Sequence, residues 1–114
     1  MTYGERLNFA RKRSGMTQTE LGKRCGLSKQ AISNYEQDVV GNIPLNKVRQ
    51  IAEVLDCNPA FICGWTDDVR TDATRFNDEF NSLNFNGVQK VYEYIHMLYA
   101  SGEYAKTTEQ HKAG

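Results

Sequence analysis

The chain has 114 residues, 14 basic and 14 acidic side chains, and a mean hydropathy of −0.63. This length allows one domain of ordinary size and a short appendage. No apolar run approaches the ~18 residues that a membrane span needs, and the first residues lack the basic and apolar regions of a signal peptide. We therefore expect a cytoplasmic protein that makes no membrane contact.

The cysteines and histidines indicate no reactive centre. Cys25, Cys57 and Cys63 are odd in number and show no CxxC spacing. We expect buried free thiols in a reducing cytosol rather than a disulfide framework or a zinc site. His96 and His111 have no plausible constellation of catalytic partners. The composition therefore predicts no enzyme, no metal and no cofactor.

Charge is distributed unevenly along the chain, although the net charge is zero. Residues 1–49 contain nine basic and four acidic side chains, an excess of +5. Residues 50–114 contain five basic and ten acidic side chains, an excess of −5. A basic part beside an acidic remainder is the asymmetry that a DNA-binding module shows.

Helical periodicity predicts two helices at the start of the chain, over about 3–13 and 17–25. Apolar residues recur in both at the spacing of one helix face. Thr17 stands at the start of the second, and Glu20 follows three residues later. This pattern predicts a capping box, in which each residue satisfies a backbone N–H of the other.

A tight turn and a third helix, over about 28–36, come next. Gly26 can take the left-handed conformation that a sharp turn needs, and Ser28 suits the N-cap of the third helix. An inward stripe of Ala31, Ile32 and Tyr35 leaves a polar face outward, which consists of Lys29, Gln30, Ser33 and Asn34. A helix of this kind fits the major groove, where such side chains reach base edges.

Two further helices are predicted over about 44–55 and 59–63. The first carries an apolar stripe at helical spacing, made of Leu45, Val48, Ile51, Ala52 and Leu55. Asn58 and Pro59 open the second helix, and Gly64 closes it. Trp65 follows directly, and we expect it to pack back on the helices before it.

The stretch from Thr17 to Glu36 resembles the helix-turn-helix of the lambdoid phage repressors and Cro proteins, within the wider Xre family of bacterial regulators. Residues 3–18 are similar to the family's first helix and its Gly-containing turn. Residues 43–65 are similar to its fourth and fifth helices, so the resemblance covers residues 3–65. It implies an all-α, five-helix DNA-binding bundle over residues 1–65, of a type expected from a Gram-positive phage or prophage.

The outward face of the third helix is the predicted base-reading surface. A glutamine side chain offers one acceptor and two donors, which suits a bidentate pair with adenine. Gln30 also falls where the family places a base-reading glutamine. Lys29 is expected to read guanine or to hold a phosphate. Ser33 and Asn34 lie one turn further on and are expected to reach other bases.

A second set of side chains is predicted to hold the DNA backbone, which fixes register without reading sequence. The resemblance places Gln18 against a phosphate. It also implies further phosphate contacts near the start of the fourth helix, where the family makes them. Val39 and Val40 stand where lambdoid repressors have basic residues, which weakens the case for a contact from that loop. The predicted set is Lys12, Arg13, Gln18, Ser28, Asn42, Asn46 and Lys47.

Arg11 is the one basic residue for which a structural role is expected. Its position matches a family arginine that pairs with a glutamate at the end of the recognition helix, which is Glu36 here. Such a pair would tie the first helix to the third in a partly buried place.

Composition changes after Trp65. Residues 66–75 are polar and acidic and are predicted to be a linker. Residues 76–103 are predicted to be a helical dimerisation segment, because apolar side chains recur there at helical spacing, at Phe76, Phe80, Val88, Val91, Tyr92, Ile95, Leu98 and Tyr99. Residues 104–114 have little to bury and are expected to be a disordered tail.

Two short helices cannot hide this stripe alone. They either fold back on the bundle or pair with the same segment of a second chain. A single recognition helix covers only about 4–5 base pairs, so two-fold pairing that reads two half-sites ~34 Å apart is favoured. We predict a repressor that binds a palindromic operator in double-stranded DNA as a homodimer. The alternative is an antitoxin, or a regulator whose C-terminal helices bind an antagonist protein.

Overall fold

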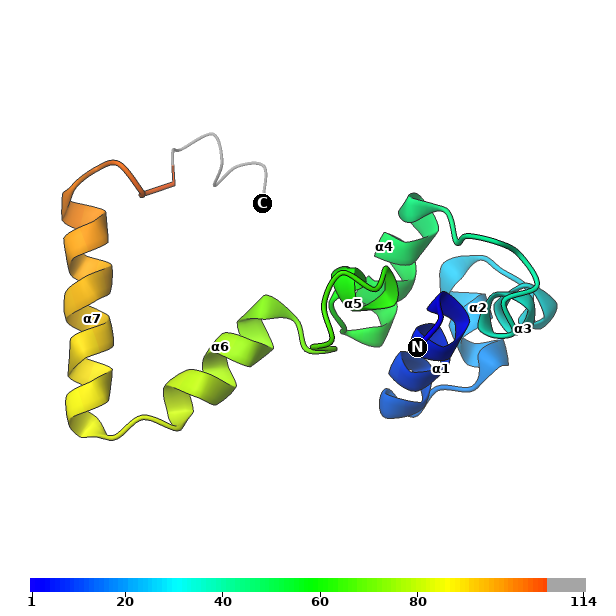
Figure 1. Cartoon of the computed structure of the whole chain (residues 1–114), viewed down its shortest axis with the longest axis horizontal. Helices are drawn as coiled ribbons and strands as arrows, with labels where there is room; N and C mark the ends of the chain where they lie inside the picture. The colour runs from blue at the N-terminus through cyan, green and yellow to red at the C-terminus, as the bar shows by residue number, and fades with distance from the viewer. Residues whose placement is uncertain (107–114) are drawn as a thin grey trace. The chain divides into compact units, whose positions relative to one another are not determined.

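The computed structural model describes residues 1–106, and every regular element in that range is an α-helix (Figure 1). The all-α fold class predicted from sequence is therefore confirmed. The described chain groups into two units, one of them Met1–Arg75 and the other beginning at Phe76. The helices are α1 (Tyr3–Arg13), α2 (Gln18–Cys25), α3 (Lys29–Glu36), α4 (Leu45–Leu55), α5 (Pro59–Ile62), α6 (Asp72–Asn81) and α7 (Phe85–Ala100).

Helices α1 to α5 enclose one hydrophobic core (Figure 1). Each of the five contributes at least one side chain that solvent scarcely reaches. Because burial of a large apolar side chain is worth about 1.5–3 kcal/mol, this set supplies most of the stabilisation of the bundle. The largest fully buried side chains are Phe61, Leu7, Leu21, Ile32, Ile51, Leu55, Ile62 and Cys25.

The capping box lies at α1 rather than at α2. The Thr2 hydroxyl accepts from the Glu5 N–H at 3.1 Å, and the Thr2 N–H donates to the Glu5 carboxylate at 2.9 Å. At α2 the Thr17 hydroxyl accepts from the Glu20 N–H, as expected. The Glu20 carboxylate, however, accepts from the Thr17 hydroxyl and not from its backbone N–H. Only half of the predicted box forms.

The start of α1 lies directly against the end of α3. A Cβ at Gly4 would overlap the backbone carbonyl oxygens of Tyr35 and Glu36, so only glycine permits this approach. Asp38 then reaches back from a left-handed conformation, φ 57°. Its carboxylate accepts from the Thr2 hydroxyl at 2.6 Å and from the Gly4 N–H at 2.9 Å. The two helices thus meet in close backbone contact, and the Asp38 side chain holds them together.

Two apolar residues predicted to face the core do not. Leu45 is 46% exposed, because it lies in the first turn of α4, before the helix meets the bundle. Trp65 is 74% exposed. Gly64, at φ 78°, turns the chain just before it, and the Trp65 N–H closes the end of α5 by donating to the Ala60 carbonyl. The backbone at Trp65 is therefore fixed while its side chain points away from the core.

Residues 66–71 are irregular in structure but attached to the first unit. The Asn58 N–H donates to the Val69 carbonyl at 2.9 Å, and Val69 packs against the hydrophobic core. Helix α6 then begins at Asp72, inside the range expected to be a linker. A short segment that is bonded to the bundle therefore takes the place of much of the predicted polar linker.

Arg6 holds the start of this segment. Its guanidinium donates to the carbonyls of Phe61 and Thr66 at 3.0 and 2.9 Å, and to the Asp67 carboxylate at 3.0 Å. It also lies 5.0 Å from the centre of the Phe61 ring, a cation–π distance. Only 8% of Arg6 is exposed. Its charge therefore serves the fold, and the sequence pattern does not distinguish it from the other basic residues.

The second unit has a different character. Neither α6 nor α7 contains a buried residue. One ring contact joins the two helices, since Phe80 meets the edge of Tyr92 with 5.9 Å between the ring centres, and within α6 Phe76 stacks on Phe80 at 5.8 Å. Asn84 caps α7, and Gly102 follows its end at φ 73°. Residues 107–114, most of the predicted disordered tail, lie outside the described residues.

Candidate nucleic-acid interface

The turn between α2 and α3 is tight and leaves little freedom to either helix. Gly26 takes the left-handed conformation at φ 68°, and the Leu27 N–H returns to the Gly22 carbonyl at 2.7 Å. A Cβ at Gly22 would lie 2.5 Å from the Leu27 carbonyl oxygen, so the turn folds directly over α2. This close packing holds α3 at a set angle to α2, which a surface that reads DNA requires.

Helix α3 presents a polar face and buries an apolar one. The Ser28 hydroxyl caps it by accepting from the Ala31 N–H at 3.1 Å, and Ile32 anchors it in the core with no exposed area. Its outward residues divide into two classes of exposure. Lys29 and Gln30 are exposed, whereas Ser33 and Asn34 are half-buried. The four predicted base-reading residues therefore occupy one solvent-accessible helix.

Glu36, at the end of α3, is the centre of a hydrogen-bond network. The Arg11 guanidinium donates to both carboxylate oxygens, at 2.6 and 3.0 Å. The side-chain amides of Asn8 and Gln18 donate to Oε1, at 2.7 and 3.2 Å. The third guanidinium nitrogen of Arg11, Nη1, donates to the Met16 carbonyl at 2.8 Å. The network joins α1, α2 and α3 through one carboxylate.

This network keeps Glu36 ionised. Burial raises the pKa of the Glu36 carboxyl, but the hydrogen bonds from Arg11, Asn8 and Gln18 and the charge of Arg11 outweigh it, so the pKa lies below its ordinary value. The hydrogen bond with Glu36 also raises the pKa of Arg11. Only 4% of the Glu36 side chain and 11% of the Arg11 side chain are exposed. The pair is therefore nearly enclosed by the bundle.

The Arg11–Glu36 pair that the family resemblance implies is thus present in the structure. Asn8 completes the network, and nothing in its local sequence marks it, because the partners lie 28 residues apart. Gln18 turns its amide toward Glu36 from the first turn of α2. Its bond to Glu36 ties the start of α2 to the end of α3.

The remaining candidates for backbone contact lie at the surface to different degrees. Lys12 and Arg13 are exposed in the last turn of α1. Asn42 and Asn46 are exposed near the start of α4, and Lys47 is half-buried with its ammonium 3.4 Å from Gln50 Oε1. Two of the nine basic residues of the N-terminal part, Arg6 and Arg11, are committed to the fold, which leaves seven basic side chains for contact with DNA.

Within the described part of the chain no three histidine, cysteine or acidic side chains come together as a metal ion would require. Burial raises the pKa of the Cys57 thiol to about 11 and raises the pKa of Cys25 and Cys63 as well. The helices of residues 1–106 include none with the length and apolar character needed to cross a bilayer.

Comparison with known proteins agrees with this geometry. Residues 7–62 match the helix-turn-helix family. The crystal structure of the P22 c2 repressor protein in complex with synthetic operator 9T, in the presence of Tl⁺, is similar to this chain with a TM-score of 0.52 and 27% sequence identity. The match covers 58% of this chain and 98% of the repressor chain. No curated protein sequence matches.

The fold and the α2–α3 surface define the class, which is that of DNA-binding transcription regulators. Residues 7–62 match the model of the helix-turn-helix family, and their fold is similar to that of a lambdoid-type repressor. This confirms the family resemblance predicted from the sequence.

Proposed function

We propose that this chain is a transcriptional repressor that binds a palindromic operator as a homodimer, with α3 in the major groove. The observation that carries the proposal is the construction of α3. Its outward face is polar and accessible, while Ile32, the Gly22–Gly26 turn and the Glu36 network hold its inner side. A rigid helix that presents amide, ammonium and hydroxyl groups on its outward face suits direct readout of base edges.

Gln30 is the principal base reader in this proposal, with an adenine as its partner. Lys29 contacts guanine or a phosphate, and Ser33 and Asn34 complete the reading face. The surface residues Lys12 and Arg13 hold the backbone of the operator. Ser28, Gln18, Asn42, Asn46 and Lys47 act with them in fixing register.

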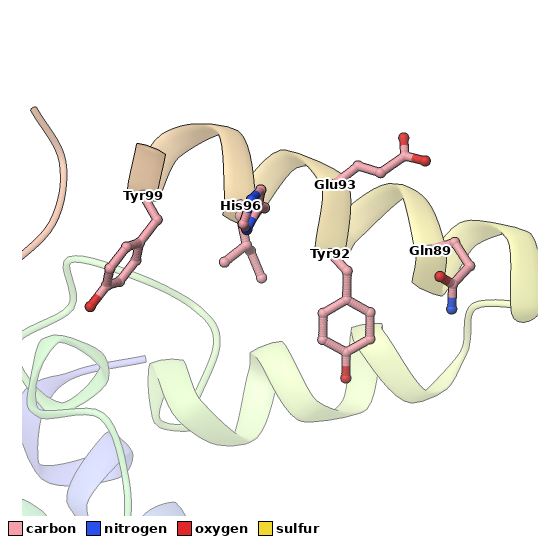
Figure 2. Close-up of a pocket in the computed structure, with 6 residues that line it drawn as sticks. Gln89, Tyr92, Glu93, His96 and Tyr99 are labelled. Carbon is pink, nitrogen blue, oxygen red and sulfur yellow. The ribbon is translucent and has the colours of Figure 1, made fainter. Parts of the chain in front are cut away.

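The α6–α7 segment supports the homodimer. Helix α7 carries an open apolar surface, lined by Gln89, Tyr92, Glu93, Ile95, His96 and Tyr99. Figure 2 shows Tyr92 and Tyr99 pointing the same way from α7, with Glu93 pointing away. Tyr92, Ile95 and Tyr99 are 56%, 43% and 68% exposed. Two-fold pairing of this surface would cover it and would give the dimer two copies of α3, one for each half-site.

Repression follows from occupancy, because a dimer on promoter DNA excludes other proteins without a cofactor. The same apolar surface of α7 also fits the alternative, in which a toxin or antagonist protein binds α6–α7 and controls the regulator. Origin in a Gram-positive phage or prophage remains a prediction.

Enrichment of genomic DNA tests the proposal. The protein is incubated with fragments of its source genome, and the retained fragments are sequenced, with Gln30→Ala as the matched variant. We expect an inverted repeat with half-site centres about one helical turn, ~34 Å, apart, and a relaxed preference at one symmetric base pair with Gln30→Ala. Retention of fragments without any common sequence would contradict operator recognition and favour the partner-controlled alternative.

A further inference from the structure

The side chains of α3 are joined to one another across single helical turns. Gln30 Nε2 donates to Asn34 Oδ1 at 2.9 Å, and Gln37 Nε2 donates to the Ser33 hydroxyl at 3.2 Å. Residues four apart are neighbours on a helix surface, so each bond is local and needs no other element. Gln30, which donates the first of these bonds, is also the principal base reader in the proposed function.

The chemistry of the amide decides what this bond does to Gln30. A glutamine amide has one acceptor oxygen and two N–H donors. A bidentate pair with adenine uses the oxygen and the N–H on the same edge, which accept from N6 and donate to N7. The second N–H faces the other way and remains available. The bond to Asn34 can therefore use the second N–H and leave the adenine-reading edge complete.

Orientation is the remaining question for an exposed glutamine. A free side chain can rotate its amide so that oxygen and nitrogen exchange places, and it loses rotamer freedom on binding. The Asn34 oxygen accepts a hydrogen bond and would repel the Gln30 oxygen. With Asn34 Oδ1 facing Gln30, as in the structure, the bond favours the orientation in which the Gln30 nitrogen faces Asn34, and it does so before DNA arrives.

Resting on the proposed function, we propose that Asn34 is a positioning residue for Gln30 and determines specificity at Gln30's base pair rather than at one of its own. Its Oδ1 fixes the plane and sense of the Gln30 amide. Adenine preference at Gln30's base pair then requires a hydrogen-bond acceptor in the side chain at position 34.

Four variants separate this role from others. Gln30→Ala identifies the base pair, as the position where preference is lost. Asn34→Ala removes the acceptor, whereas Asn34→Asp retains it and adds a negative charge that weakens binding to any sequence. Gln37→Ala removes the neighbouring bond to Ser33 and serves as the matched control, because Gln37 is exposed and lies outside the proposed reading face. Dissociation constants are measured on the enriched site and on versions with each other base at Gln30's pair.

We expect the wild-type protein and Gln37→Ala to prefer adenine at Gln30's pair by about tenfold or more. Asn34→Ala should prefer it by less than about threefold, with an unchanged melting temperature, since Asn34 lies outside the core. Asn34→Asp should keep the preference at lower overall affinity. In the Gln30→Ala background, Asn34→Ala should change nothing at that pair, because the two residues act as one unit.

Full adenine preference in Asn34→Ala would overturn the inference, and so would loss of preference in Asn34→Asp. In either case a relaxed preference in Gln30→Ala would leave the proposed function in place. If the wild-type protein selects no sequence at all, the proposed function fails and this inference fails with it.

Discussion

The two units of this chain treat their apolar side chains in opposite ways. In the bundle of α1 to α5, side chains from every helix meet in a closed core. In α6 and α7 no residue is buried, and large side chains such as Phe76, Tyr92 and Tyr99 remain more than half exposed. The bundle therefore closes its own core, whereas α6–α7 leaves exposed the apolar side chains by which we propose that two copies pair.

The core of the bundle should respond most strongly to truncation. Phe61 is 1% exposed and contacts both Phe9 and Arg6, whereas Trp65, four residues later, is 74% exposed. Phe61→Ala should cost about 3–5 kcal/mol of unfolding free energy, and Trp65→Ala less than about 0.5 kcal/mol. Urea unfolding of both variants checks the pair. Similar costs would show that Trp65 belongs to the core after all.

The Glu36 network should come next in size. Glu36→Gln leaves the Arg11 guanidinium enclosed without a charged partner, which should cost about 3 kcal/mol. Chemical unfolding measures the loss. Glu20→Gln is the matched control, because Glu20 is exposed and bonds only within the first turn of α2. Equal effects of the two changes would argue against an enclosed ion pair.

The same network predicts a dependence on pH. Because the pKa of Glu36 is lowered in the folded state from its ordinary value of 4.5, the unfolded chain takes up this proton first as pH falls. The stabilisation is complete above about 4.5 and is lost as pH falls through the lower, folded-state pKa. In urea unfolding, Glu36→Gln should lose stability less steeply than the wild type as pH falls below about 5. Parallel pH curves would contradict this.

Changes in α7 should leave the bundle intact and act on assembly. Ile95→Asp places a charge in the apolar surface, so we expect a monomer and a loss of operator affinity of about 100-fold or more. Met97→Asp is the control, since residue 97 lies about 200° further round the helix. Sedimentation and a binding titration measure both. A dimeric Ile95→Asp protein would show that this surface serves another partner.

Surface charge should produce the smallest effect. Lys12→Ala removes one exposed cation from α1, so it should weaken binding to specific and random DNA alike. The slope of log affinity against log salt should become shallower by about one for each phosphate that the variant no longer neutralises. Titrations at several salt concentrations measure this slope. A weakening confined to the specific sequence would contradict a backbone role for Lys12.

The sequence predicted best what depends on neighbouring residues. Gly26, Ser28 and the amphipathic stripe of α3 are local signals, and the structure contains the turn, the cap and the buried Ile32 that they indicate. The family resemblance supplied the Arg11–Glu36 pair, which no local pattern contains. The predicted bounds of all five helices of the bundle agree with the observed bounds to within a residue or two.

The sequence did not predict what depends on distant partners. From the sequence alone Arg6 has the pattern of a surface cation. In the fold its guanidinium donates to the carbonyls of Phe61 and Thr66, which lie far away along the chain. Gly4 is required only because α3 ends against it. Trp65 illustrates the converse, since a large apolar residue is expected to pack and the turn at Gly64 directs it outward. In each case a tertiary contact or a turn decides the role of the residue, and helical periodicity predicts neither.

The number of chains bound to the enriched operator tests the central claim most directly. Sedimentation of the protein with a duplex that carries the inverted repeat gives this number, and the same duplex with one half-site scrambled provides the comparison. We predict two chains on the full repeat and a loss of affinity of at least tenfold on the scrambled duplex. The opposite result would be a single chain on the full repeat with equal affinity for both duplexes. It would contradict the claim that the bundle reads each half-site while α6–α7 pairs two copies.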